Sequence, residues 1–482
     1  MGFVLVLVLA RQLGAAGSGV VLQTIAAFMI ALSLARLGMD TAAVWILPRL
    51  RSESPDLARG AVTGLLLGAG TAGSVVALLW WVVQWTQADG ALGEWRVAET
   101  ITSVVWALPL ASVMLVALAA TRGFGGVLPF NLIGNIAVPF ARPAGVLGVT
   151  LLGGGVTAAA MTWAVPWVPG MLAAVGVLLL QVRRLERRTG ARGRWLPGWR
   201  VQRRIFGFAL PRTLASALEQ SIIWFDVVLV GIIAGSAAAG VYGAASRFVG
   251  AGVIVLTALR IVVAPRFSAM LAEKRLDDVQ SLYAVTAGWI LLFGAPIYVL
   301  LAFFSPTVLG WLGPDFDEGV TSLVVLCAGA VMLLAGGNIQ SLLLMSGHSG
   351  WGAFNKLTVF SVNVVGNLLL VPHLGILGAA ATWAVCMALD TALAMFQVYR
   401  FTRIRPAVGR IAAIVGAVAG CAALPSWLMI ALLGNSTSAL VLSAALTGVL
   451  VLGYAVLDRR RLHLGELATL LPRRRARTTS SS

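Results

Sequence analysis

Two neighbouring apolar runs contain ionisable side chains at positions where a charge is costly. Residues 206–270 read as two long helices joined by a small-residue turn; the first contains Glu219 and Asp226, the second Arg247 and Arg260. Each helix is long enough to cross a bilayer. A charge at hydrocarbon depth costs at least about 2.5–3.5 kcal/mol, so such residues normally face a bundle interior or a watery cavity. These side chains are therefore the first candidates for a functional site.

The spacing of these charges limits how they can act together. Asp226 follows Glu219 by seven residues, so both carboxylates project from about the same helical face. Arg247 and Arg260 are thirteen residues apart, which is about 220° around a helix, so they share a face only if the helix kinks. Two hypotheses stay open for Arg247: an interhelical ion pair with Asp226, or a place in the lining of a cavity. We expect Arg260 to extend toward the lipid headgroups.

Two further charges lie inside other apolar runs. Arg142 stands between Pro139 and Pro143, so its helix should be kinked or broken. Irregular backbone at membrane depth occurs where it lines protein or a cavity, so Arg142 is the anion-binding candidate of the first half. Asp390 is a candidate for a proton or cation site, or for packing against a polar neighbour.

The composition is that of an all-α polytopic membrane protein. Of 482 residues, 59% are hydrophobic and only 11% are charged, whereas soluble proteins have roughly 25% charged residues. The net charge of +17 comes mainly from arginines between the apolar runs, which indicates cytoplasmic loops and not nucleic-acid binding. The three cysteines lie inside apolar runs without metal or redox spacing, so we predict no metal and no cofactor.

The apolar runs predict fourteen spans, of which the first is truncated. The stretch 3–10 is too short to cross about 30 Å of hydrocarbon. We expect an in-frame upstream extension to add about 15–20 residues to it. The remaining spans are expected at 18–36, 60–85, 98–120, 130–152, 156–182, 206–233, 241–263, 284–304, 320–345, 354–371, 376–399, 408–433 and 437–457.

Alternating loop charges fix the expected orientation. One set of links is arginine-rich, as at 183–204, and the opposite set is neutral or acidic, as at Asp89 with Glu94 and at 315–318. By the positive-inside rule the basic side, including the tail, is cytoplasmic in a cell membrane. The expected organisation is an N-terminal lobe (1–182), a basic linker (183–205), a C-terminal lobe (206–399), two added spans (400–457) and a basic tail (458–482).

An internal repeat divides the spans into two sets of six. Residues 158–165 read AAAMTWAV and residues 379–385 read AAATWAV, with Trp163 and Trp383 in register. Other matched positions share an offset of about 220 residues, such as Gly19 with Gly240. Because six is even, the two halves are parallel repeats, an arrangement typical of transporters with a central site.

Two stretches of the sequence resemble a known family. The runs GVYGAASRFVGAGVIVLTALRIVVAPRFSAML and ARQLGAAGSGVV…LARLGMDTA resemble polysaccharide-biosynthesis flippases of the Wzx type, in the multidrug/oligosaccharidyl-lipid/polysaccharide exporter superfamily. The resemblance implies two six-helix lobes facing a cavity, and a secondary transporter that flips a lipid-linked oligosaccharide. It also implies a pyrophosphate-bearing lipid substrate, membrane lipids, and polymerase or glycosyltransferase partners.

Other functions are weighed against this one. A cation-coupled multidrug antiporter of the same superfamily would have carboxylates in its cavity, so Glu219, Asp226 and Asp390 keep it open. The sequence has no G-x-x-x-x-G-K-[ST] loop for ATP hydrolysis. A membrane glycosyltransferase or polymerase needs a polar active site, and no external loop is long enough to hold one. We therefore expect a transporter and not an enzyme.

The loop charges make a direct topological prediction. A reporter fused after Arg194 should read cytoplasmic, and one fused after Asp317 should read external, because the first link is basic and the second acidic. Paired alkaline phosphatase and green fluorescent protein fusions measure this. Both reporters on one side would contradict the span count and the parallel repeat.

Overall fold

The computed structural model describes residues 2–86, 96–190, 193–405 and 408–457, and these residues form helices without strands. Twelve described helices are long and apolar enough to span a membrane, or thirteen if one bent pair is a span. The expectation of an all-α polytopic membrane protein is confirmed, while the count of fourteen spans stays a prediction. The basic tail and the acidic pair Asp89 and Glu94 lie outside the described residues.

The chain divides into two compact units, which are described separately. Unit 1 comprises residues 1–247, 312–318 and 360–379, and unit 2 comprises 248–311, 319–359 and 380–482. The division crosses helices α11 (Ser236–Ala272), α16 (Ser349–Leu374) and α17 (Ile376–Thr402). The lobe and linker boundaries expected from the sequence stay predictions.

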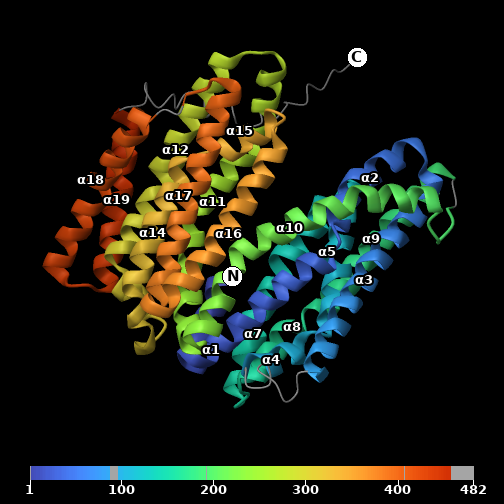
Figure 1. Cartoon of the computed structure of the whole chain (residues 1–482), viewed down its shortest axis with the longest axis horizontal. Coiled ribbons are helices and arrows are strands. Elements are labelled where there is room, and N and C mark those ends of the chain that lie inside the picture. The colour runs from blue at the N-terminus through green and yellow to red at the C-terminus, as the bar shows by residue number, and fades with distance from the viewer. Residues whose placement is uncertain (1, 87–95, 191–192, 406–407, 458–482) are drawn as a thin grey trace, which may run out of the picture. The chain divides into compact units, whose positions relative to one another are not determined.

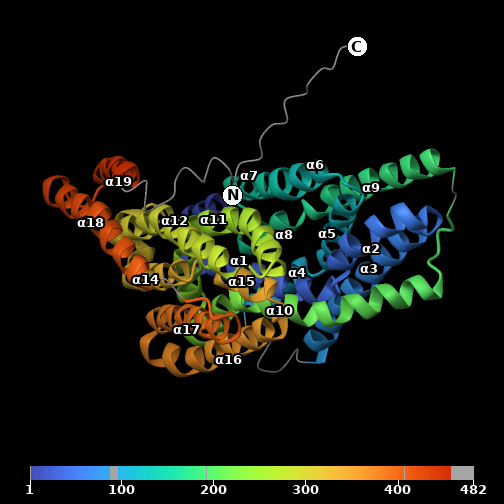
Figure 2. The ribbon, with the colours of Figure 1, turned by 90° about the horizontal axis from the view of Figure 1, so that it is seen from above.

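Unit 1 is built around two long helices and a layered group of shorter ones. α1 (Gly2–Ala35) packs on α10 (Trp199–Ala234), and α5 (Ala107–Gly123) packs against α9 (Trp167–Thr189) and α3 (Pro55–Thr86). Both ribbon views place α3, α5 and α9 side by side (Figure 1, Figure 2). The remaining helices are α2 (Met39–Glu53), α4 (Arg96–Val104), α6 (Val127–Pro129), the π-helix η1 (Phe130–Ala137), α7 (Val138–Leu151), α8 (Val156–Ala164) and the 3₁₀ segment η2 (Pro314–Gly319).

Unit 2 is organised around α12 (Leu276–Phe303). This helix packs against α14 (Val320–Ala335), α18 (Val408–Leu433) and α19 (Thr437–Leu457). Its core contains Phe267, Tyr283 and Leu342, each fully buried, and the Tyr283 hydroxyl donates to the carbonyl of Gly336 at 3.2 Å. The short helices α13 (Ser305–Gly310) and α15 (Ile339–Met345) complete the unit.

Two expected spans are broken in the structure, and a third begins as a π-helix. The span expected at 98–120 is α4 followed by α5, bent by 53°. The span expected at 320–345 is α14 followed by α15, separated at Gly337, whose φ of +53° ends the first helix. The break expected at Arg142 is not found: Arg142 lies inside α7, an unbroken helix with Pro143 in its interior, and the irregular backbone is the π-helix η1, which ends five residues earlier at Ala137.

Helix breaks repeat at the spacing of the sequence repeat. The short stretch at 3–10 forms the beginning of α1, and this helix has a non-helical residue at Gly14 (φ 66°, ψ −174°). Gly235 has a similar conformation (φ 89°, ψ 168°) between α10 and α11. These φ values favour glycine. The two glycines are 221 residues apart (235 − 14), the same separation as Gly19 and Gly240 (240 − 19).

Gly19 and Gly240 allow two backbones of unit 1 to approach closely. A methyl group at Gly19 would overlap the carbonyl oxygen of Ser236, and one at Gly240 would overlap the carbonyl oxygen of Ala15. Ala15 and Ser236 are also 221 residues apart (236 − 15). The equivalent position of each repeat therefore lies against the glycine of the other repeat. Small residues of this kind are what permit close helix packing in membranes.

The close approach of the two backbones at Gly19 and Gly240 predicts that neither position tolerates a side chain. Gly19→Ala and Gly240→Ala should each lower the thermal unfolding midpoint in detergent, because the new methyl group meets backbone atoms that cannot rotate away. The matched control is Gly207→Ala on α10, where nothing lies within 4 Å of the added methyl group. The control should be neutral or stabilising by up to about 1 kcal/mol through helix propensity. Equal effects at Gly19 and Gly207 would contradict the close approach.

Candidate functional site

Asp226 is a buried carboxylate held by neutral hydrogen-bond donors. Its side chain, on α10 in unit 1, is 3% exposed. The hydroxyl of Tyr242 on α11 donates to Oδ2 at 3.0 Å, and the amide of Asn367 on α16 donates to Oδ1 at 3.2 Å. Asn367 also donates to the carbonyl of Asn363 at 2.8 Å, which fixes the amide. These bonds satisfy both oxygens, and none of the ion pairs among the described residues includes this carboxylate.

Arg247 contacts an aromatic ring. Its guanidinium, five residues after Tyr242 on α11, lies 3.8 Å from the ring centroid of Trp224 on α10. The ion pairs among the described residues do not include Arg247 with Asp226, so the pairing hypothesis is not realised. Desolvated cation–π contacts are worth about 2 kcal/mol, enough to hold an arginine without a carboxylate partner.

The other two charges of this stretch are exposed. Glu219 on α10 is exposed although Asp226, two turns away, is buried, so their common face does not give them a common environment. Arg260, on the part of α11 that belongs to unit 2, is also exposed, and its extension to the lipid headgroups stays a prediction.

Arg142 lies between two tryptophan rings. Its guanidinium carbon is 4.5 Å from the centroid of Trp163 on α8 and 4.4 Å from that of Trp167 on α9. Phe28 of α1 packs against both tryptophans, at 5.3 and 6.1 Å between centroids, and so fixes the rings. The Nε and Nη2 atoms of Arg142 are buried, and no described residue forms a hydrogen bond with them. A guanidinium with free, preoriented donors is suited to bind a phosphate or carboxylate.

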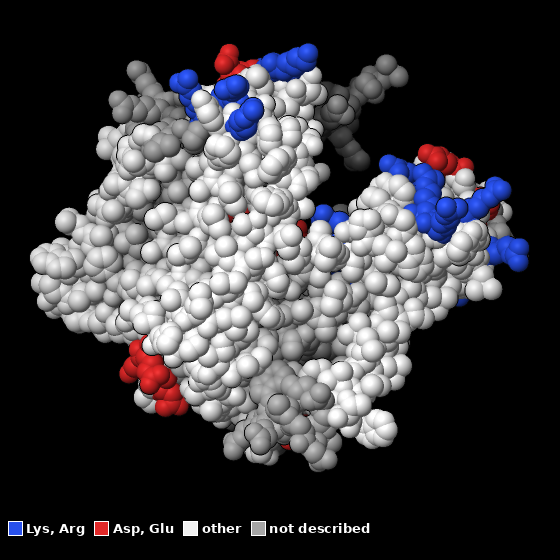
Figure 3. All heavy atoms as spheres, in the orientation of Figure 1, with Lys and Arg blue, Asp and Glu red and all other residues white. Residues whose placement is uncertain are grey.

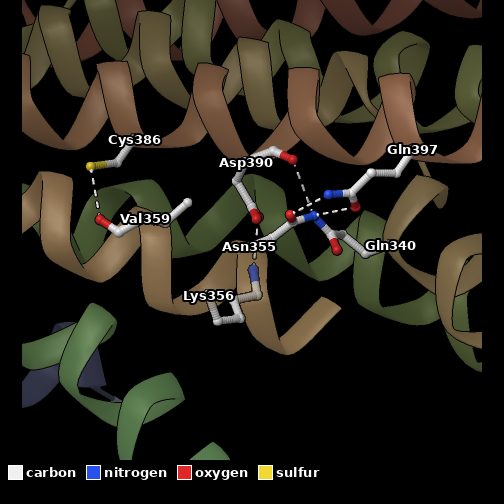
Figure 4. Close-up of polar contacts among 7 residues, drawn as sticks. All are labelled: Gln340, Asn355, Lys356, Val359, Cys386, Asp390 and Gln397. Carbon is white, nitrogen blue, oxygen red and sulfur yellow. Dashed lines mark hydrogen bonds and ion pairs between the residues drawn. The ribbon is translucent and has the colours of Figure 1, made fainter. Parts of the chain in front are cut away.

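Asp390 is neutralised by a lysine in unit 2. The ammonium of Lys356 on α16 lies 2.7 Å from Oδ2 of Asp390 on α17, whose side chain is only 4% exposed (Figure 4). The second oxygen, Oδ1, is buried and has no hydrogen-bond partner in the part of the chain that the structure describes. The Lys356 side chain is 33% exposed, so one member of this pair is open to its surroundings and the other is not.

Amide side chains surround this pair. Asn355 and Gln397 exchange two hydrogen bonds, at 2.8 and 2.6 Å, and Gln340 on α15 donates to the backbone carbonyl of Asp390 at 3.3 Å (Figure 4). The thiol of Cys386 donates to the carbonyl of Val359 at 3.6 Å (Figure 4). The polar groups of this cluster are thus held by three helices.

Charges outside the apolar runs gather at helix ends. Figure 3 shows blue Lys and Arg side chains over the ends of α2 and α9 in unit 1, where the sequence places Arg49, Arg51 and residues 183–188. Arg36 and Asp40, one helical turn apart in number, form an ion pair at 2.8 Å. Across the described residues, no group of three or more His, Cys, Asp or Glu side chains is placed to hold a metal ion.

Several partners at these sites escaped the sequence reasoning. Lys356, Asn363 and Asn367 lie in one apolar run on α16, and the four-residue spacing of the two asparagines was the available signal. Trp163 was noticed only as a repeat marker, and its contact with Arg142 depends on the packing of two separate helices. Trp224, two positions before Asp226, gave no signal of its own.

Comparisons with known proteins agree with this fold. The family model described as "Polysaccharide biosynthesis protein" matches residues 1–271. The probable low-salt glycan biosynthesis flippase Agl15 of Haloferax volcanii is 23% identical over 216 residues, 43% of this chain and 44% of that protein. The matched part therefore spans less than half of this curated relative's length.

Solved structures show the same fold at low identity. The lipid II flippase MurJ, in an inward closed conformation, has a TM-score of 0.69 at 11% identity and covers 96% of this chain and 97% of its own. An inward-facing multidrug resistance MATE family transporter of the MOP superfamily has a TM-score of 0.66 at 14% identity, covering 86% and 94%. A MOP superfamily transporter from Pyrococcus furiosus has a TM-score of 0.57 at 14% identity, covering 85% and 91%.

The family match covers more than half of the 482 residues and confirms the resemblance seen in the sequence. The chain belongs to the polysaccharide biosynthesis protein family.

Proposed function

We propose that this protein is a secondary transporter that flips a lipid-linked, phosphate-bearing oligosaccharide or polysaccharide precursor across the cytoplasmic membrane. The observation that carries the proposal is Arg142, whose guanidinium lies between Trp163 and Trp167 with Nε and Nη2 unpaired. Burying a hydrogen-bond donor without an acceptor costs free energy of folding. The two unpaired donors of Arg142 therefore favour an anionic ligand at that position.

Two other arginines are further candidates for binding substrate anions. Arg247 is held by Trp224 and has no carboxylate within ion-pair distance in the described chain. Arg260 is exposed further along the same helix. Pyrophosphate and acidic sugars have several anionic oxygens, and guanidinium groups bind such oxygens in a bidentate manner.

The carboxylates are the candidates for coupling to an ion. Asp226 contacts neutral donors only, and Asp390 has one buried oxygen without a partner. These two observations also favour the second candidate function, a cation-coupled multidrug antiporter of the same superfamily. Glu219 is the weakest candidate because it is exposed. The unpaired arginines favour the anionic substrate over a cationic drug.

The proposed setting follows from the loop charges and the family. The basic links, and with them the C-terminus, would face the cytoplasm in a multi-pass arrangement. Glycosyltransferases would supply the lipid-linked substrate and a polysaccharide polymerase would use the flipped product. The transporter itself would make or break no covalent bond.

The proposal predicts that Arg142 and Arg247 matter for export more than for folding. Arg142→Ala and Arg247→Ala should each reduce surface polysaccharide at least tenfold in a strain lacking the native gene. Their membrane levels should stay normal, because neither arginine leaves a buried carboxylate unpaired. Lysine at either position should restore export only in part, since it keeps the positive charge but not the planar guanidinium that donates to two oxygens at once.

The control for both arginines is Arg275→Ala. Arg275 is an exposed residue between α11 and α12 that pairs with Glu273 and Asp278, and its loss should leave export unchanged. A well-folded Arg142→Ala protein with normal export would overturn the substrate-binding role. If Arg247→Ala were unstable and Asp226→Ala restored it, the ion-pair hypothesis would be correct instead.

The Lys356–Asp390 pair predicts an asymmetric effect on stability. Lys356→Met should cost about 3–5 kcal/mol, because it leaves the buried Asp390 carboxylate without its cation. Asp390→Asn should cost less, since the partly exposed lysine can turn toward its surroundings. Thermal unfolding in detergent measures both. The double variant Lys356→Met/Asp390→Leu should regain most of the loss, and Arg275→Met, at an exposed pair, should cost under about 1 kcal/mol. Equal losses for Lys356→Met and Arg275→Met would show that the pair is not buried.

A further inference from the structure

Two exposed asparagines lie inside an apolar span of unit 1. The span covers Val127–Leu151 and comprises α6, the π-helix η1 and α7. Asn131 and Asn135 belong to η1, and both are exposed. The amide of Asn135 donates to the Oδ1 atom of Asn131 at 2.9 Å, so the two side chains lie on one side of the helix. π-helices are rare and often occur at functional sites.

This single bond leaves most of the hydrogen-bonding capacity of the two amides unused. An asparagine side chain has two N–H donors and an oxygen with two lone pairs. No other hydrogen bond joins either amide to a described residue. Asn131 therefore keeps both of its donors, and Asn135 keeps one donor and its whole oxygen. Uncharged groups that both donate and accept match the hydroxyl groups of a sugar, which do the same.

The apolar side chains of the span show which side of it meets lipid. Exposed apolar residues recur at four-residue intervals and are between 47% and 67% exposed: Leu128, Leu132, Ile136 and Phe140. Each asparagine directly precedes one of them, so the amides point to a different side of the helix. Polar side chains within a membrane are costly unless they face a bundle interior or a watery cavity. The amide side of η1 is therefore suited to water and not to lipid.

The second sequence repeat uses the matching asparagine for packing. Phe130 and Asn131 correspond to Phe354 and Asn355. Asn355 is fully buried in unit 2, where it exchanges two hydrogen bonds with Gln397 (Figure 4). Asn131 is exposed, and among the described residues its amide bonds only to its neighbour on η1. Helix packing therefore explains the amide of the second repeat but not that of the first.

The amides lie on the same span as Arg142. Asn135 precedes Arg142 by seven residues, which is about 10 Å along a helix. The amides are thus too far away to bind a phosphate held at Arg142, and they would meet the part of a substrate next to it. The start of η1 is fixed by Arg122 of α5, whose guanidinium lies 4.1 Å from the ring centroid of Phe130.

We propose that Asn131 and Asn135 form a sugar subsite, in which their amides bind hydroxyl groups of the oligosaccharide while Arg142 binds the adjoining phosphate. The inference rests on the proposed function, because it takes the same lipid-linked substrate. It adds two uncharged side chains that recognise the sugar part of that substrate.

The reactivity of single cysteines tests which side of η1 faces water. Of the three native cysteines only Cys421 is not buried, so Cys421→Ser gives a quiet background. In permeabilised membranes, Asn135→Cys should react with a water-soluble methanethiosulfonate reagent, whereas Ile136→Cys, on the apolar side, should not. An unreactive Asn135→Cys, or equal reaction at both positions, would overturn the sugar subsite.

Binding of two probes by the purified full chain tests the sugar contact. The probes are polyprenyl diphosphate and the lipid-linked oligosaccharide extracted from a strain that lacks the gene. Asn131→Ala and Asn135→Ala should each weaken binding of the oligosaccharide probe about fivefold, the factor that corresponds to about 1 kcal/mol for one hydrogen bond. Neither should change binding of polyprenyl diphosphate. The control is Leu132→Ala, on the apolar side of η1, which should change neither affinity.

Arg142→Ala separates this inference from the proposed function. It should weaken binding of both probes, because both contain the diphosphate. If Arg142→Ala weakens both and the asparagine variants weaken neither, the sugar subsite is wrong and the proposed function stands. If only the asparagine variants lose affinity for the oligosaccharide, the subsite stands and the phosphate site at Arg142 is wrong.

Thermal unfolding distinguishes recognition from a structural role. Asn131→Ala and Asn135→Ala should leave the unfolding midpoint in detergent unchanged, because both residues are exposed. A lowered midpoint together with weaker binding of both probes would show that the amides support η1 and do not recognise sugar.

Discussion

The close approach of backbones at Gly19 and Gly240 is the constraint on which the rest of unit 1 depends. Because neither residue has a Cβ, α1 can lie against the start of α11 and along α10. α10 provides Asp226 and Trp224, and α1 provides Phe28, which packs on the tryptophans around Arg142. One helix crossing thus sets the position of both the acidic and the basic candidate sites.

Each deep charge is accommodated by a different physical means. Arg142 and Arg247 lie on aromatic faces, Asp226 accepts neutral hydrogen bonds, and Asp390 pairs with Lys356. An ion pair neutralises a charge, whereas an aromatic face leaves the donors of a guanidinium free. This difference separates the groups that could bind a substrate anion from those that serve packing or ion coupling.

The sequence was sufficient to predict the fold class and most helices, because an apolar run of about twenty residues indicates a membrane-spanning helix. It also located the repeat, and the helix breaks at Gly14 and Gly235 follow that repeat. Partners could not be predicted, since the contact of Arg142 with Trp163 depends on packing between helices and not on spacing along one. The seven-residue spacing placed Glu219 and Asp226 on one helical face, but it could not show that Asp226 is buried while Glu219 is exposed.

The central claim is that the guanidinium held by Trp163 and Trp167 binds the phosphate of a lipid-linked substrate. The most direct measurement is the dissociation constant of a polyprenyl diphosphate oligosaccharide and of the uncharged polyprenol, for the wild type and Arg142→Ala in detergent. The account predicts that Arg142→Ala weakens binding of the diphosphate at least tenfold, the loss of one charge-assisted hydrogen bond, and leaves polyprenol binding unchanged. Equal affinities of both proteins for the diphosphate would contradict it.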